Sequence, residues 1–109
     1  MKFKMNDRDW EIKEVEQKKM REIEEDNGKN TYFGLTVYDE QVIYLWEELP
    51  TQQKRQTLLH ELFHCYLGVY VSFQELELKE ELVCNLVANS HDIIHKIAED
   101  YFNRKKVGE

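Results

Sequence analysis

The sequence predicts an α+β domain in which strands come first and two long helices follow. The first half of the chain holds the runs that are rich in β-branched and aromatic residues. Residues 51–70 contain no proline, and no glycine before Gly68, and their apolar residues recur three and four positions apart. A second helical pattern runs from about residue 75 to residue 104. We therefore expect a small N-terminal antiparallel sheet packed on two helices.

The N-terminal residues show the alternation of a strand with one buried face. Residues 3–5 alternate between apolar and charged side chains, and residues 6–9 are typical of a turn. Residues 10–15 alternate again and predict a strand. Residues 16–26 are dense in charge, which leaves two interpretations open: a short surface helix or a poorly packed connection.

Two further β-forming runs predict a hairpin. Residues 31–37 and 41–45 are both rich in β-formers, and residues 38–40 form a tight connection between them. Gly34 stands in the middle of the first run. A glycine at such a place indicates a bulge or a close approach by another backbone.

The second half of the chain predicts two helices. Pro50, the one proline in the chain, stands directly before the first helix, which we expect to run to about Tyr70. Residues 71–74 interrupt the pattern. The second helix carries a long apolar stripe, formed by Leu78, Leu82, Leu86, Ile93 or Ile94, Ile97 and Tyr101.

Length and charge restrict the classes of protein to consider. A chain of 109 residues suits one domain, spanning residues 1–109. Its net charge of −7, with a single basic run at residues 104–106, argues against a nucleic-acid partner. No apolar run approaches the roughly 18 residues of a membrane span, and no secretory h-region follows Met1. Cys65 and Cys84 form no Cys-x-x-Cys motif, so we expect a cytoplasmic protein with reduced thiols.

The first helix carries the motif His-Glu-x-x-His at residues 60–64. His60 and His64 are one turn apart on the same helix face, so both imidazoles can bind one metal ion. Glu61 is next to His60 and can take a proton from a water at the ion. Short motifs of this kind also arise by chance on amphipathic helices. Here the motif lies within the apolar stripe, where two histidines and a glutamate are poor choices for packing alone.

A catalytic zinc ion (Zn²⁺) takes three protein ligands and a water, so the chain must supply a third ligand. The candidates in the second helix are Glu77, Glu80, Glu81, Cys84, His91 and His95. Because a helix rises 1.5 Å per residue, His91 lies about 15 Å along the axis from Glu81, and His95 about 21 Å. The acids and these histidines therefore cannot serve the same ion, and spacing alone leaves the choice open.

Two segments together resemble a known family. Residues 58–64, followed by residues 81–88, resemble the ImmA/IrrE-type metallopeptidases, small gluzincins common in phages and integrative elements. The second motif of that family is Glu-x-x-Ala-Asn/Asp-x-x-Ala. Glu81, Asn85 and Ala88 match it, whereas Cys84 stands where the family has Ala, and Phe63 where it often has Gly.

The resemblance implies a zincin-like minimal metallopeptidase. Its zinc ligands are then His60, His64 and Glu81, and its general base is Glu61. For His91 and His95 we expect a place on the surface or behind the ligands, and not a role as ligands. The implied activity is hydrolysis of peptide bonds in an intracellular protein, such as a transcriptional repressor of a phage or mobile element. The alternative is a non-catalytic binding module, pinned by zinc, that sequesters a regulatory partner protein.

Overall fold

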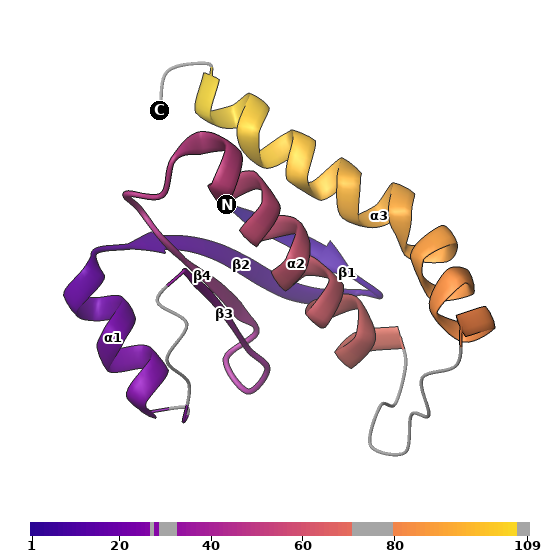
Figure 1. Cartoon of the computed structure of the whole chain (residues 1–109), viewed down its shortest axis with the longest axis horizontal. Helices are drawn as coiled ribbons and strands as arrows, with labels where there is room; N and C mark the ends of the chain where they lie inside the picture. The colour runs from indigo at the N-terminus through magenta and orange to yellow at the C-terminus, as the bar shows by residue number, and fades with distance from the viewer. Residues whose placement is uncertain (27, 29–32, 71–79, 107–109) are drawn as a thin grey trace.

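The computed structural model describes residues 1–26, 28, 33–70 and 80–106. Within these ranges, a four-stranded sheet is covered by three helices. The elements in chain order are β1 (Lys2–Met5), β2 (Arg8–Val15), α1 (Gln17–Asp26), β3 (Gly34–Val37), β4 (Val42–Trp46), α2 (Thr51–Tyr70) and α3 (Glu80–Lys106). The sheet has α1 on one face, whereas α2 and α3 lie side by side on the other (Figure 1). The α+β class is confirmed.

The sheet is mixed, so the expectation of an antiparallel sheet is wrong. The strand order is β1-β2-β4-β3, and β2 pairs with β4 in parallel. The other two pairings, β1 with β2 and β3 with β4, are antiparallel. A parallel pair needs a long crossover connection, and the chain between β2 and β4 supplies one through α1 and β3. The sheet thus consists of two hairpins, β1–β2 and β3–β4, joined by the pairing of β2 with β4. Strands β1 and β3 are at its edges.

The predicted turns are present. Asn6 and Asp7 have φ values of 51° and 60° and form a two-residue hairpin turn of the kind that matches strand twist. The predicted turn over residues 6–9 is therefore shorter, because Arg8 already begins β2. Gln41, with φ of 58°, closes the turn between β3 and β4. Of the predicted strand over residues 31–37, residues 31 and 32 lie outside the described ranges.

The charged segment after β2 is a helix, which decides between the two interpretations of residues 16–26. Its buried residues Met20 and Ile23 pack on one face of the β3–β4 hairpin. The resulting small core consists of Met20, Ile23, Leu35, Val37, Val42 and Tyr44. The chain therefore has three helices in its described part rather than two, and the helix with the His-Glu-x-x-His motif is the second.

The larger core lies on the opposite face of the sheet. Helix α2 has the predicted bounds, and it buries Leu58, Leu62 and Cys65 against the sheet and α3. Residues 71–79, with the expected break and the expected start of the last helix, lie outside the described ranges. Helix α3 ends at Lys106, close to the expected end. In the described part of the chain, no helix has the length and apolar character needed to cross a membrane.

Strand β3 lies unusually close to α2. Leu35 and Val37 join the core under α1, and because side chains alternate along a strand, Gly34 and Thr36 face α2. A Cβ on Gly34 would lie 2.7 Å from Thr57 Cγ2 and 3.2 Å from Glu61 Cγ. The glycine thus marks a close approach, as expected. The two nearest atoms belong to side chains of α2, and the third, at 3.3 Å, is the backbone oxygen of Tyr44 on β4.

Candidate metal centre

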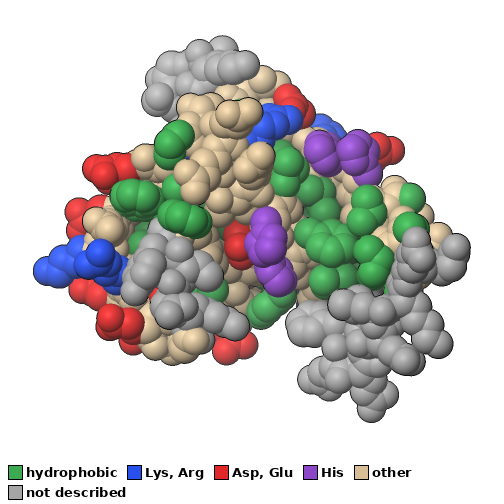
Figure 2. Space-filling view, in the orientation of Figure 1, with side chains coloured by type: hydrophobic (Ala, Val, Ile, Leu, Met, Phe, Trp, Pro, Cys, Tyr) green, Lys and Arg blue, Asp and Glu red, His purple; other side chains and the backbone are tan. Residues whose placement is uncertain are grey.

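The two predicted histidine ligands and the predicted general base, Glu61, lie on adjacent turns of α2. The Nε2 atoms of His60 and His64 are 3.1 Å apart, and His60 Nε2 is 4.0 Å from Glu61 Oε2. One ligand atom from each of the three residues falls within a 4.8 Å cluster. Figure 2 shows a histidine group and an acidic group side by side near the middle of this face. The helix spacing therefore places both imidazoles at one point on the surface.

The separation of the two nitrogens fits a zinc ion. Zinc binds imidazole nitrogen at about 2.0–2.1 Å, so nitrogens 3.1 Å apart subtend roughly 100° at an ion that both contact. This angle is close to the tetrahedral value. The His60 side chain is 69% exposed, which leaves it open to a ligand from solvent. The histidine pair therefore fits the metal that the motif predicts.

Glu61 differs from the histidines because its side chain is only 10% exposed. The hydroxyl of Thr36, on β3, donates a hydrogen bond of 2.7 Å to Glu61 Oε1. The same hydroxyl is 3.1 Å from the backbone oxygen of Glu61. A buried carboxylate needs such a partner, since an unpaired one would be strongly destabilising. The strand and the helix thus meet at the carboxylate of the motif.

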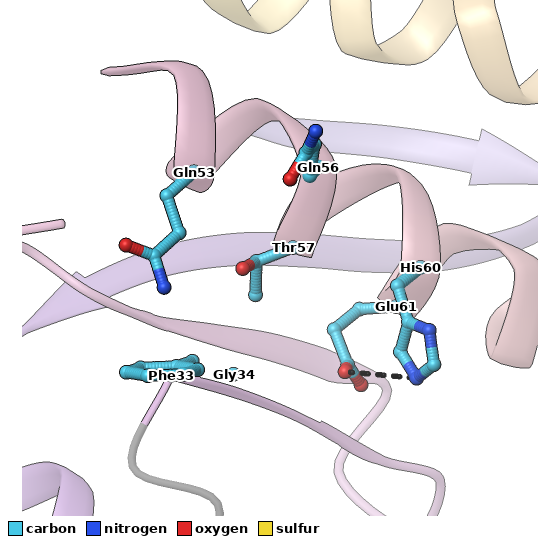
Figure 3. Close-up of a pocket in the computed structure, with 7 residues that line it drawn as sticks. All are labelled: Phe33, Gly34, Gln53, Gln56, Thr57, His60 and Glu61. Carbon is cyan, nitrogen blue, oxygen red and sulfur yellow. Dashed lines mark ion pairs between the residues drawn. The ribbon is translucent and has the colours of Figure 1, made fainter. Parts of the chain in front are cut away.

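A groove runs between β3 and α2 along these residues. It consists of two adjoining hollows that share Gly34, His60 and Glu61. The first has a volume of about 350 Å³ and is completed by Phe33, Gln53, Gln56 and Thr57. The second, of about 220 Å³, is completed by Leu35, Thr36, Tyr38 and His64. Figure 3 shows His60 and Glu61 on α2, with Gly34, at the start of β3, and Phe33, just before it, on the other side of the hollow.

Tyr38 holds the far end of this groove. Its hydroxyl donates a 2.9 Å hydrogen bond to the backbone oxygen of His64. Its ring lies against Gly68, where an added Cβ would be 2.4 Å from Tyr38 Cε1. Partial burial, with Cys65 and Glu61 nearby, raises the pKa of Tyr38 to about 12, so the phenol keeps its proton at neutral pH. Tyr38 therefore ties the end of β3 to the helix turn that carries His64.

Comparison with known proteins decides the family. A family model described as the IrrE N-terminal-like domain, a peptidase family, matches residues 15–105. The chain belongs to this ImmA/IrrE-type family. Membership confirms the resemblance seen in the two motifs. It supports a metallopeptidase-like function, which implies a metal cofactor and a protein or peptide substrate. Searches of curated proteins and of solved structures returned no match.

The expected third ligand of this family member lies at the start of α3. Glu81 is in the first turn of that helix, but its side chain is outside the described part of the structure, so its role stays a prediction. Asn85 and Ala88, which complete the second family motif, are exposed. Leu82 and Leu86 of the same turns contact the larger core instead. These two leucines belong to the apolar stripe that packs α3 on the larger core.

Of the other candidate ligands, His91, His95 and Cys84 are not part of the cluster on α2. Glu77 and the side chain of Glu80 lie outside the described part of the structure. His91 and His95 stack on each other along α3, with ring centroids 4.0 Å apart. Figure 2 shows histidine side chains in two separate groups. Cys84 is exposed and free, whereas Cys65 is buried, and burial raises the pKa of the Cys65 thiol to about 12. Cys65 is consequently a neutral core residue.

Sequence reasoning missed Thr36 and Tyr38, although both line the groove. Thr36 was part of a β-forming run, and Tyr38 was part of the turn after it. The position of Gly34 could have indicated Thr36. The glycine predicts that one face of this strand lies close to another part of the chain, and Thr36, two positions later, is on the same face.

Proposed function

We propose that this chain is a zinc-dependent endopeptidase of the cytoplasm, acting as a single domain over residues 1–109. His60, His64 and Glu81 hold the zinc ion, and Glu61 is the general base. The observation that carries the proposal is the geometry of the motif: two Nε2 atoms 3.1 Å apart, beside a carboxylate, in a groove bounded by an edge strand.

The groove suits an extended peptide. Strand β3 is at the edge of the sheet, and an edge strand offers backbone groups with which a further strand can pair. A peptide added beside β3 would pass His60 and Glu61, because both line the hollows next to this strand. The lining of the larger hollow is otherwise uncharged, with Phe33, Gln53 and Thr57. This half of the groove therefore suits neutral side chains of the substrate.

The carboxylate of Glu61 is placed for proton transfer. Its Oε2 atom lies 4.0 Å from His60 Nε2, whereas its Oε1 atom accepts the hydrogen bond from Thr36. In peptide hydrolysis Glu61 would take the proton of the attacking water and later give it to the leaving amine. A bound zinc ion supplies a Lewis acid that polarises a carbonyl oxygen and acidifies water.

The substrate that we propose is an intracellular protein, with a transcriptional repressor of a phage or mobile element as the first candidate. This choice rests on the resemblance of the two motifs to the family. The rival function, a zinc-pinned module that sequesters a partner, requires the same ion and the same histidines. The two functions differ in one requirement: the peptidase needs the carboxylate of Glu61 for its effect on the partner protein, and the binding module does not.

Metal analysis of the purified protein tests the first step. We expect about one zinc per chain, because two histidines and a carboxylate make a three-ligand site. His64→Ala should abolish binding, since it removes half of the 3.1 Å histidine pair. Glu81→Ala should lower zinc affinity, while the control His91→Ala, on the separate pair, leaves it unchanged. A protein that neither contains zinc nor takes it up would contradict the proposal.

A further inference from the structure

We propose that Thr36 is a positioning residue, which holds the carboxylate of Glu61 in the orientation that general-base chemistry requires. This inference rests on the proposed function. Its starting point is a contrast in burial within one motif, since the His60 side chain is 69% exposed and the Glu61 side chain 10%. An exposed carboxylate would be oriented by water, whereas a buried one is oriented by its protein partners.

The hydroxyl of Thr36 has one proton to give and two acceptors within reach. Glu61 Oε1 is at 2.7 Å and the Glu61 backbone oxygen at 3.1 Å. The bond to the carboxylate is shorter, and bonds to ionised acceptors are stronger than those to neutral ones. The carbonyl of Glu61 also lies inside α2, where helix bonds satisfy backbone oxygens. The bond that Thr36 adds is therefore the one to the side chain.

Strand β3 lies close enough to α2 for Thr36 to contact Glu61. Gly34 lies two positions earlier on the same strand face, and a Cβ there would be 3.2 Å from Glu61 Cγ and 2.7 Å from Thr57 Cγ2. Any larger residue would push β3 away from α2 and lengthen the Thr36 bond. Thr36 itself is buried, and its branched Cβ leaves few rotamers. Gly34 thus allows β3 to lie close to α2, and Thr36 forms the hydrogen bond that this short distance makes possible.

The two carboxylate oxygens of Glu61 therefore have different surroundings and different roles. Oε1 accepts from Thr36, while Oε2 is 4.0 Å from His60 Nε2. Fixing Oε1 fixes the plane of the carboxylate, and with it the direction in which Oε2 faces. Because β3 is also the edge strand proposed to receive the peptide, one strand positions both the substrate and the base.

The test compares Thr36→Val, which keeps the shape but removes the hydroxyl, with Thr36→Ser, which keeps the hydroxyl. Three-bond NMR couplings report the side-chain torsions of Glu61, in metal-free and in zinc-loaded protein. Those from Cγ to the backbone nitrogen and carbonyl carbon report χ1, and that from Cδ to Cα reports χ2, the torsion that places the carboxylate. We expect one dominant Glu61 rotamer in the wild type and in Thr36→Ser, and averaged couplings in Thr36→Val. The matched control is Thr57→Val, the same change in the same groove, which should keep the wild-type rotamer. Unchanged couplings in a folded Thr36→Val protein would overturn the proposal.

A kinetic measurement on the zinc-loaded protein adds a second readout. The probe is the member of an internally quenched peptide library that the wild type cleaves fastest. Thr36→Val should lower kcat by about 10–100-fold, as the loss of a supporting bond near a metal site commonly does, with KM little changed. Thr36→Ser should restore most of the rate. A changed KM with an unchanged kcat would overturn the positioning role. Absence of cleavage by the wild type would instead count against the proposed function, and the NMR comparison would still decide the role of Thr36.

Discussion

At the scale of single residues, Glu61 combines two properties that rarely occur together on a helix surface. It is nearly buried, and yet it borders the groove beside two histidines. A buried acid that served packing alone would be replaced without loss by an apolar residue. The arrangement is explained if the acid takes part in chemistry.

Glu61→Gln should separate metal binding from catalysis. The amide has nearly the same size and can still accept the Thr36 hydroxyl, so folding and zinc content should match the wild type. It cannot take a proton at neutral pH, and a positioned acid–base group contributes about 10²–10⁴-fold to rate. We therefore expect cleavage of the peptide library to fall by about that factor. If Glu61→Gln and wild type act equally on a partner protein from the host, the non-catalytic module is favoured instead.

The residues that could be predicted are those that depend on local spacing. His60, Glu61 and His64 are grouped by the helix period, so the motif alone placed them together. Thr36 depends on how a strand 25 residues away docks on the helix, which no local pattern reports. The role of Glu81 depends on the register of α3 against α2, which follows from the packing of the whole apolar stripe of α3 in the larger core and not from a local motif.

At the scale of elements, the helices could be predicted better than the pairing of the strands. The bounds of α2 follow from Pro50, the apolar period and the absence of early glycine. The parallel pairing of β2 with β4 is not local, because it depends on α1 and β3 being inserted between them. Alternation in β2 indicates a buried face but does not say which strand lies beside it.

The contact between Tyr38 and Gly68 gives a prediction at this scale. Gly68→Ala should destabilise the protein by about 1–3 kcal/mol, because the new Cβ would lie 2.4 Å from the Tyr38 ring. In a Tyr38→Ala background the same change should stabilise by roughly 0.5–1 kcal/mol, since alanine favours a helix more than glycine does. Urea unfolding of the four proteins measures both values. Equal effects in the two backgrounds would show that the ring does not occupy this position.

At the scale of the whole molecule, one buried polar cluster joins the sheet to both large helices. Lys54 Nζ, on α2, donates to Glu14 Oε1 of β2 at 2.6 Å and to the backbone oxygen of Glu47 at 2.8 Å. The hydroxyl of Tyr101, on α3, donates to the other oxygen of Glu14. These contacts fix the N-terminal end of α2 on the sheet, and therefore also help to fix the width of the groove farther along that helix.

Lys54→Met tests this cluster. The Lys54 and Glu14 side chains are only 9% and 16% exposed, so removal of the ammonium leaves a carboxylate without its cation in a mostly buried place. Breaking such a pair costs roughly 3 kcal/mol or more, which is a large share of the stability of a small domain. The control is Lys96→Met, which breaks an exposed pair with Asp100 and should change stability by about 0.5 kcal/mol or less.

A double variant distinguishes the loss of the cation from the loss of packing. Lys54→Met together with Glu14→Gln removes both charges, so it should be more stable in urea than Lys54→Met alone. The amide oxygen that the second change introduces can still accept the hydrogen bond from Tyr101. If the double variant is instead less stable than Lys54→Met, the carboxylate of Glu14 stabilises the fold through partners other than Lys54. Tyr101→Phe then tests whether the hydroxyl that donates to Glu14 contributes to that stability.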